Sequence, residues 1–402
     1  MDGEVQTMST ERGDTDQSMV SVCGIGAVTG YGWGQKLLRE GLYSGQSAVR
    51  PTPGYGSHLP DDLAWVAPVE DGGDPDDGPT RFARATRFAA REAVHNAVDR
   101  GWRPGAVVGV IHGFVLGDVD GWRSYHHRHG RDATRREWLS LMPSTVLSEI
   151  NREFDFHGPT MGVTAMCASG VSGLLTAKLW IDTGLCTDVL VVCSDLSLSP
   201  ENCAAFGRLG VLVTDQPPNV VCRPFQEGTT GFNCGEAAVA MIVSGRPDGA
   251  YAVVRGGAMT NDGFHPVSIA PDHAEVFRAF HLALDAARVH PTEIAYLNAH
   301  ATGTLQCDEA ERRVLDELLV AAEGVFSLKP LTGHCQGAAG AVELLGSLYG
   351  FQTGVIPAPY RVAPGHPRLL DGPTACVEGP VAKSSLGMGG NNAVVVLDAP
   401  AA

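Results

Sequence analysis

Residues 161–181 read MGVTAMCASGVSGLLTAKLWI, and this stretch decides the fold. Residues 161–165 have the length of a short strand, and residues 171–181 have the length and apolar spacing of a buried helix. Cys167 stands between them, among small residues. A strand that leads directly into a buried helix is typical of an α/β protein. The start of the helix also brings free backbone N–H groups close to the cysteine, which favours the thiolate over the thiol.

The same alternation of strands and helices continues along the chain. It predicts an α/β fold whose sheet is mainly parallel, with helices on both faces. The predicted strands are residues 20–25, 107–111, 189–194, 237–243, 252–255, 294–298 and 394–397, and the predicted helices are 35–41, 80–100, 274–288, 308–322 and 337–349.

No repeat is visible in the sequence, but the two halves have a similar order of elements, which is compatible with a duplicated core. We place an N-terminal half at residues 19–255, which holds the cysteine, and a C-terminal half at residues 256–402. The polar residues 1–18, mixed in charge, predict a disordered tail and neither a signal peptide nor an anchor.

Two histidines also stand among small residues. His300 lies in NAHATGT, residues 298–304, just after a predicted strand, and His334 lies in GHCQGAAG, residues 333–340. A thiol beside two imidazoles suits carbon–carbon chemistry, because the thiol can carry an acyl group while the rings stabilise a carbanion. A lone cysteine or histidine is more often a structural residue. Three such segments in one chain predict a single active site.

Composition narrows the class of protein. The 402 residues are 44% hydrophobic, which indicates a globular chain, and 29 Lys and Arg against 45 Asp and Glu give a net charge of −16. Such a charge disfavours binding to nucleic acid or anionic membranes. No apolar run approaches the roughly 18 residues that a membrane helix needs. Ten cysteines without C-x-x-C pairs predict a reducing, cytoplasmic location.

These segments resemble those of the β-ketoacyl synthases of the thiolase superfamily, in particular the elongating bacterial type that works with acyl carrier protein. The resemblance begins at VSVCGIGAVT, residues 20–29, includes Arg223-Pro224-Phe225 and Gly235-Glu236, and ends at GMGGNNA, residues 387–393. It implies a thiolase-like fold, which is a duplicated core of mainly parallel sheets with helices between and around them.

The resemblance also implies roles for individual residues. Cys167 matches the acylated nucleophile, and His300 and His334 match the pair that handles decarboxylation and stabilises the enolate. Lys329 matches the lysine ahead of the second histidine. The remaining matches are Thr302 and Thr304 as pantetheine contacts, Met388 with Cys167 as the source of oxyanion-hole N–H groups, Phe114 near the acyl pocket, Asp308 as an acidic support, and Glu311 as a support for Lys329 or for the local backbone.

The implied reaction is a decarboxylative Claisen condensation. An acyl group moves to Cys167, a malonyl-type extender loses carbon dioxide, and the carbanion attacks to give a 3-oxoacyl thioester. No metal and no bound cofactor are expected, because the departing carbon dioxide drives formation of the carbanion. The phosphopantetheine arm belongs to the acyl carrier protein. A homodimer, or a heterodimer with a related subunit, is also expected.

An acidic carrier protein would need a basic docking patch on this acidic chain. Two arginine clusters are candidates, and an ordinary solvated surface explains each of them about equally well. The first is Arg81, Arg84, Arg87 and Arg91, and the second is Arg123, Arg128, Arg131, Arg135 and Arg136.

The chain departs from the family pattern in a few places. Met166 precedes the nucleophile where a small residue is usual, Leu386 and Met388 stand where phenylalanines are common, and Ala301 replaces a glycine. These departures favour a specialised synthase of polyketide or other secondary metabolism. Two alternatives stay open: an acyltransferase that forms an ester, amide or thioester without decarboxylation, and a noncatalytic partner subunit of a synthase. A thiol protease is a weaker idea, since it gives the two histidine segments no role.

Overall fold

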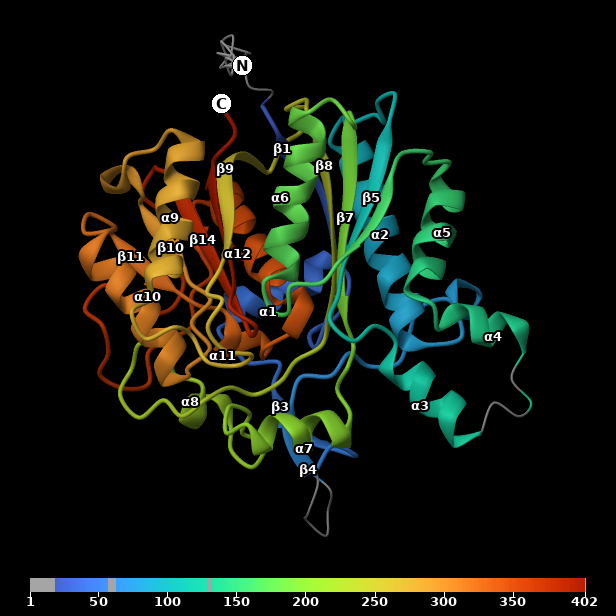
Figure 1. Ribbon diagram of the computed structural model, residues 1–402, viewed down its shortest axis with the longest axis horizontal. Coiled ribbons are helices and arrows are strands. Elements are labelled where there is room, and N and C mark those ends of the chain that lie inside the picture. Colours follow the sequence, from blue (N-terminus) through green and yellow to red (C-terminus); the bar gives the residue numbers. More distant parts are fainter. Residues whose placement is uncertain (1–18, 57–62, 129–131, 133, 402) are drawn as a thin grey trace, which may run out of the picture.

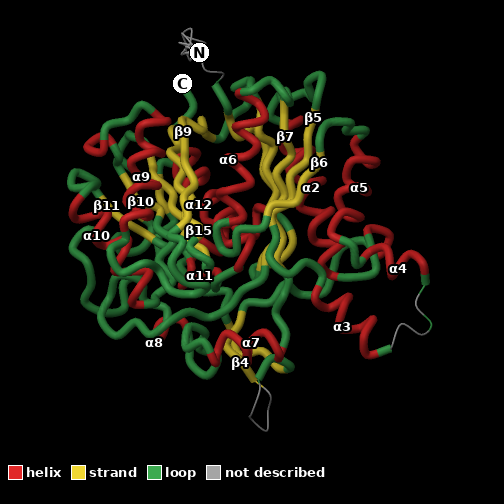
Figure 2. The backbone as a smooth tube through the Cα atoms, in the orientation of Figure 1, coloured by secondary structure: helices red, strands yellow, loops and turns green. Residues whose placement is uncertain are grey.

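The computed structural model describes residues 19–56, 63–128, 132 and 134–401, so the tail expected at 1–18 lies outside the described residues. Figure 1 shows five layers across the molecule: outer helices, strands, a central pair of helices, strands, and outer helices. Figure 2 shows loops gathered at one end of the strands. Within the described part of the chain, no helix is both long and apolar enough to cross a membrane.

The elements follow in chain order. The first half contains β1 (Ser21–Thr29), β2 (Gly32–Trp33), α1 (Gln35–Ser44), β3 (Arg50–Pro53), β4 (Leu63–Val66), α2 (Arg81–Asp99), β5 (Val108–Gly113), α3 (Val119–His127), α4 (Arg135–Ser140), α5 (Pro143–Phe154), β6 (Thr160–Val163), α6 (Ser169–Asp182), β7 (Asp188–Asp195), α7 (Pro200–Arg208), α8 (Pro218–Val221) and β8 (Ala237–Ser244). The second half contains β9 (Ala252–Asn261), α9 (Ala274–Ala287), β10 (Tyr296–Asn298), α10 (Leu305–Glu317), β11 (Gly324–Phe326), α11 (Lys329–Thr332), α12 (Ala339–Thr353), β12 (Val355–Ile356), β13 (Thr374–Ala375), β14 (Val381–Gly387) and β15 (Asn391–Asp398).

The strand order confirms the duplicated core. The main sheet runs β11-β10-β14-β15-β9-β1-β8-β7-β5-β6, with β2 paired to β1. Outward from the centre, β1-β8-β7-β5-β6 and β9-β15-β14-β10-β11 repeat one order of strands within each half. In both halves a central helix, α6 or α12, follows the outermost strand. The predicted division at 255/256 stays a prediction; it falls inside β9, and this topology favours the connection at residues 245–251.

The sheet is mixed, whereas the alternation of elements predicted a mainly parallel one. β5 pairs in parallel with β6 and β7, and β10 with β11 and β14. The central pairings from β14 through β15, β9, β1 and β8 to β7 are antiparallel. Only residues 388–390 join β14 to β15, too few for the crossover that parallel neighbours require. The prediction assumed a helix between successive strands, and no helix intervenes here.

The two central helices cross closely because glycines face each other at the crossing. A Cβ on Gly170 would lie 2.7 Å from the Ala341 backbone nitrogen, and one on Gly340 would lie 3.1 Å from Val171 Cγ2. The contact at Gly170 leaves no room for a side chain, and the contact at Gly340 is tighter than ordinary packing. Cys167 lies in the corner of the chain that leads into α6, and His334 lies in the corner that leads into α12. The crossing therefore brings these equivalent corners of the two halves together.

Glycine also allows the outer helix α2 to lie against β1. A Cβ on Gly26 would lie 2.2 Å from the Ala89 carbonyl oxygen and 2.7 Å from the Ala93 nitrogen. We expect Gly26→Ala to lower the free energy of unfolding by about 1–3 kcal/mol, because the backbones must separate to admit the methyl group. Denaturant unfolding measures this change. Gly207→Ala on α7 is the matched control, since no atom lies within 4 Å of its added Cβ; equal stability of the two variants would contradict the packing argument.

Candidate active site

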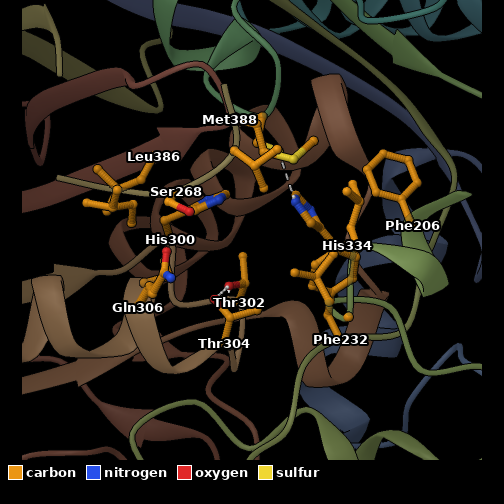
Figure 3. A pocket seen from close by; sticks show the side chains of 18 of the residues that line it. Phe206, Phe232, Ser268, His300, Thr302, Thr304, Gln306, His334, Leu386 and Met388 are labelled. Atoms are coloured by element: carbon orange, nitrogen blue, oxygen red, sulfur yellow. Dashed lines mark hydrogen bonds between the residues drawn. The ribbon is translucent and has the colours of Figure 1, made fainter. Parts of the chain in front are cut away.

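Three side chains from distant parts of the sequence meet in one cavity. His334 Nε2 lies 3.1 Å from Cys167 Sγ, and the rings of His300 and His334 meet edge to face with centroids 5.4 Å apart. The sulfur and one ring nitrogen of each histidine all lie within 4.8 Å of one another. Figure 3 shows both rings directed into the same space beside Met388. The structure thus brings together the three segments that the sequence singled out, and their catalytic roles stay a prediction.

The turn between β6 and α6 holds Cys167 under strain. Met166 has φ of 51°, in the left-handed region that residues other than glycine rarely adopt. Ser169 ties the turn together: its hydroxyl accepts from the Ala165 N–H at 2.9 Å and donates to the Met166 carbonyl at 2.6 Å. The sulfur therefore has a fixed position at the start of α6.

The end of β14 lies directly against this turn. A Cβ on Gly387 would lie 2.6 Å from the Ala165 carbonyl oxygen and 3.3 Å from the Cys167 nitrogen, so only glycine fits there. The next residue, Met388, hydrogen-bonds the Cys167 sulfur through its backbone N–H. This donor matches the one expected for the oxyanion hole, and its presence at the sulfur is compatible with that role.

Glu311 fixes the loop that carries His300. Its two carboxylate oxygens accept the backbone N–H groups of His300 at 2.8 Å and of Ala301 at 2.6 Å, and Ser384 Oγ also donates to it. The sequence analysis left open whether Glu311 supports Lys329 or the local backbone. The hydrogen bonds are to the local backbone, while the Lys329 ammonium contacts a different carboxylate.

Asp308 supports the same region from one helical turn earlier on α10. Its carboxylate accepts the N–H groups of Phe225 and Gly303, each at 3.0 Å. Burial raises the pKa of Asp308 to about 7, although these two donors oppose the shift. Asp308 is thus a structural acid that joins the Arg-Pro-Phe landmark to the loop after His300.

The backbone of His334 is held by the Gly-Glu landmark segment. Its N–H donates to the Asn233 carbonyl at 2.7 Å, and its carbonyl accepts from the Gly235 N–H at 3.1 Å. The Phe232 ring meets the imidazole edge to face at 4.8 Å. A Cβ on Gly235 would lie 2.3 Å from the Thr332 carbonyl oxygen, which explains the glycine at this position.

Lys329 determines which nitrogen of His300 carries the proton. Its Nζ lies 3.1 Å from His300 Nδ1 and also donates to the His300 carbonyl. An ammonium group has only donors, so Nδ1 accepts and the ring proton lies on Nε2. His300 therefore turns an N–H donor away from Lys329. The predicted proximity of Lys329 to the site is present in the structure.

Sequence reasoning missed two charged residues behind the histidines. Glu343 on α12 contacts Lys329 Nζ through Oε1, and Lys383 Nζ on β14 lies 2.7 Å from Glu343 Oε2. Each interrupts an apolar run, AVELLG in the helix and VAKSSLG in the strand. A charged residue inside a buried element requires a partner, and this signal in the sequence pointed to both.

Burial determines the resting charges of the site. Burial, aided by the Lys329 ammonium, holds the pKa of His300 and of His334 well below the usual value, so both rings are neutral at pH 7. Burial raises the pKa of Cys167 to about 12, and Lys329 and the Met388 N–H only partly oppose it. The sulfur therefore rests as a thiol, contrary to the expectation that the start of the helix favours the thiolate.

The cavity around these groups has a volume of about 370 Å³. Besides Cys167 and the histidines, its lining includes Thr302, Thr304 and Met388, as expected for substrate contacts. The two threonine hydroxyls lie 2.8 Å apart, and Figure 3 shows them on the side of the cavity away from Met388. The other lining residues are Phe206, Leu209, Gly210, Val211, Thr230, Phe232, Val267, Ser268, Ile269, Leu305, Gln306, Cys307, Gln336, Leu386 and Gly387.

Phe114 does not line this cavity, unlike the other expected contact residues. Its ring packs against His112 with centroids 4.9 Å apart and lies beside Gly162. The residue directly follows β5, and its ring lies over the adjacent strand β6. Its expected place in the acyl pocket rested on an uncertain register in the resemblance, and the described cavity does not include it.

The first arginine cluster is partly buried and fully paired. Its four side chains are 12–30% exposed, and each makes an ion pair. Arg81 pairs with Asp120 and Glu236, and Arg87 and Arg91 both pair with Glu153. This candidate docking patch is therefore a partly buried network of ion pairs along α2.

The second arginine cluster is more exposed but is also partly paired. Arg123 pairs with Glu201 and Arg128 with Glu137, while Arg131 lies outside the described residues. Arg135 and Arg136 at the start of α4 are exposed and make no ion pair among the described residues, so the second cluster keeps free positive charge there.

Comparison with known proteins identifies relatives over nearly the whole chain. Residues 17–248 match the family described as "Beta-ketoacyl synthase, N-terminal domain", and residues 251–362 match "Beta-ketoacyl synthase, C-terminal domain". A polyketide beta-ketoacyl synthase of Streptomyces cyaneus is 30% identical over 84% of this chain and 86% of its own length. A 3-oxoacyl-[acyl-carrier-protein] synthase 2 of Staphylococcus aureus is 28% identical over 94% of this chain and 97% of its own.

Solved structures share the fold. A ketosynthase (ApeO) of Xenorhabdus doucetiae, solved with its chain length factor (ApeC), is similar with a TM-score of 0.82 at 21% identity, over 95% of this chain and 98% of that one. The ishigamide ketosynthase/chain length factor is similar with a TM-score of 0.82 at 24% identity, over 95% and 99%. These likenesses confirm the predicted thiolase-like fold.

The raised pKa of the thiol predicts how Cys167 reacts with an alkylating agent. Only the thiolate is nucleophilic, so below a pKa of about 12 the alkylation rate should rise about tenfold per pH unit. We expect the rate with iodoacetamide, measured by intact mass between pH 6.5 and 9, to rise without a plateau. Cys167→Ser gives the background from the other cysteines. A plateau below pH 8 would show that the sulfur rests as a thiolate.

Proposed function

The chain belongs to the β-ketoacyl synthase family, and from this premise we propose that it joins an acyl thioester to a malonyl-type thioester by decarboxylative Claisen condensation. The supporting observation is the approach of one sulfur and two neutral imidazoles within 4.8 Å in a single cavity. Cys167, His300, His334 and Lys329 are the catalytic residues we propose. Relatives of this chain include ketosynthases of both fatty-acid and polyketide synthesis. We propose that this chain acts in polyketide synthesis or in another pathway of secondary metabolism.

In the first half-reaction we propose that Cys167 takes the acyl group. The sulfur attacks the carbonyl carbon of the incoming thioester, and its proton passes to His334 Nε2, 3.1 Å away. The backbone N–H groups of Cys167 and Met388 hold the oxyanion that forms. When the carbon–sulfur bond to the carrier breaks, the proton from His334 goes to the departing thiolate. The products are an acyl-Cys167 and a free carrier thiol.

In the second half-reaction the neutral histidines act as donors. The proton on His300 Nε2, fixed there by Lys329, faces the thioester oxygen of the extender, and His334 joins it as a donor after its ring proton has moved from Nδ1 to Nε2. The carboxylate leaves as carbon dioxide, and the electron pair is held as an enolate. The enolate carbon attacks the acyl carbon, the bond to Cys167 breaks, and the sulfur takes up a proton from water, which is the one proton that the overall reaction consumes. A protonated His334 could not accept the Cys167 proton. The lowered pKa values of the two histidines therefore favour this reaction.

We propose an acyl carrier protein as the partner that delivers both substrates. Its phosphopantetheine arm would extend through the cavity past Thr302 and Thr304, and the chain then needs no bound cofactor or metal of its own. We also propose a homodimer, or a heterodimer with a related subunit. In support, β6 ends the strand order, and its outer edge has no strand partner among the described residues.

Release of carbon dioxide tests the proposed reaction. We expect the protein, given an acyl carrier and a carboxyl-labelled malonyl carrier, to release labelled carbon dioxide and form a 3-oxoacyl carrier. Cys167→Ala should abolish self-acylation and condensation, and His300→Ala or His334→Ala should reduce decarboxylation at least about a hundredfold. Cys376→Ala, at a half-buried cysteine remote from the cavity, is the matched control.

Each alternative function has its own outcome in the same assay. Acylation of Cys167 followed by transfer to oxygen, nitrogen or sulfur without carbon dioxide would identify an acyltransferase. A chain that is never acylated, yet raises the product yield of a related subunit, would be a noncatalytic partner. Either result would overturn the condensation.

A further inference from the structure

Two buried lysines share one buried carboxylate behind the histidine pair. Lys329 Nζ contacts Glu343 Oε1, and Lys383 Nζ lies 2.7 Å from Oε2, with all three side chains at most 1% exposed. The Lys383 contact is an ion pair poorly aligned for a hydrogen bond, and the ammonium donates to the Ser384 carbonyl. With both lysines protonated, these three side chains have a formal charge of +1; burial lowers the pKa of Lys383, and the Glu343 carboxylate opposes that shift.

Charge balance alone does not require Lys383. Lys329 already neutralises Glu343, and burial of a further charge costs several kcal/mol. The chain has only four lysines, and two of them meet here. Lys383 lies at the β14 position paired with Asn298 of β10, two residues before His300. An unneeded, costly charge placed beside the active loop points to a functional use.

The groups that face the histidine rings come from several elements. Lys329, Lys383 and His334 all hold the pKa of His300 down, and Lys329 and Lys383 do the same for His334, in each case after burial as the first cause. The negative groups packed nearby are Glu343 of α12, Glu311 and Asp308 of α10, and Asp195 at the end of β7. The neutral thiols of Cys167 and Cys307 complete the shell.

We propose that Lys383 is a positioning residue that contacts Glu343 at Oε2, while Lys329 contacts Oε1, and that it adds one positive charge to the groups behind the two imidazoles. It touches no reacting atom. The charge acts through space: it disfavours the imidazolium forms and favours the negative enolate that forms in front of the rings. Its hold on Glu343 Oε2 also leaves Lys329 free to orient His300. This inference rests on the proposed function for its catalytic consequence, but the charge effect itself does not.

Variants that change the cluster charge in steps test the proposal. The wild type has +1, Lys383→Met has 0, Glu343→Gln has +2, and the double variant Lys383→Met/Glu343→Gln returns to +1. Loss of a positive charge raises the histidine pKa values, so the protonated, inactive fraction appears at higher pH. The acid limb is the low-pH side of the plot of decarboxylation rate against pH, measured with the malonyl carrier. We expect it to move up by about one pH unit in Lys383→Met, and to return toward the wild-type position in the double variant.

The double variant separates a charge role from a packing role. If Lys383 only fills space, the double variant should be at least as impaired as Lys383→Met, and its acid limb should not return to the wild-type position. That result would overturn the proposal. An unmoved acid limb in Lys383→Met would do the same. Lys36→Met, the same change at an exposed lysine, is the control. The carboxyls of Asp308 and Asp195, whose pKa values burial raises to about 7 and about 6, are common to all variants and cancel in the comparison.

A second readout does not depend on condensation. In protein labelled at the histidine ring carbons, the signals of His300 and His334, assigned with single substitutions, report ring protonation directly. We expect their titration to begin at higher pH in Lys383→Met than in the wild type and the double variant. If the wild type releases no carbon dioxide at any pH, the proposed function fails, while these titrations still decide the role of Lys383.

Discussion

The close crossing of α6 and α12 is the constraint on which the site depends. Gly170 leaves no room for a Cβ at the crossing, and Gly340 leaves less than ordinary packing needs, so the two helices come close to each other there. Each helix starts at the corner that carries one reacting group, Cys167 or His334. Because the corners are equivalent positions of the two halves, the duplication of the fold itself generates the 3.1 Å contact between sulfur and imidazole.

Buried carboxylates fix the loops that this crossing brings together. Glu311 and Asp308 each accept two backbone N–H groups around the His300 loop, and Asp195 accepts the N–H of Gly337 at 3.2 Å just after His334. Backbone donors in a buried loop would otherwise lack partners. These acids therefore hold the geometry, while burial, aided by the positive charge of Lys329 and Lys383, keeps the rings within it neutral. One set of charged groups positions the site and another determines its chemistry.

The sequence predicted those parts of the protein that depend on local pattern. The helix expected at 80–100 is α2, which begins after Thr80 as its N-cap, and the expected strands at 189–194 and 237–243 are β7 and β8. The mixed sheet was not predictable in this way, because pairing between β1 and β9 depends on contacts across more than 200 residues. Likewise, the cluster of Glu343 and Lys383 arises only when α12 and β14 pack together.

Backbone strain in the site follows from the same packing. Met166, Ala301 and Gln336 have φ of 51°, 25° and 46°, and each lies within two residues of Cys167, His300 or His334. Ala301 stands where the family usually has glycine, which adopts such a conformation without cost. Strained residues persist only where the surroundings over-determine them, and the Glu311 carboxylate on the Ala301 N–H supplies that restraint. The acids Glu311 and Asp195 therefore also restrain the strained segments at Ala301 and Gln336, while Ser169 does so at Met166.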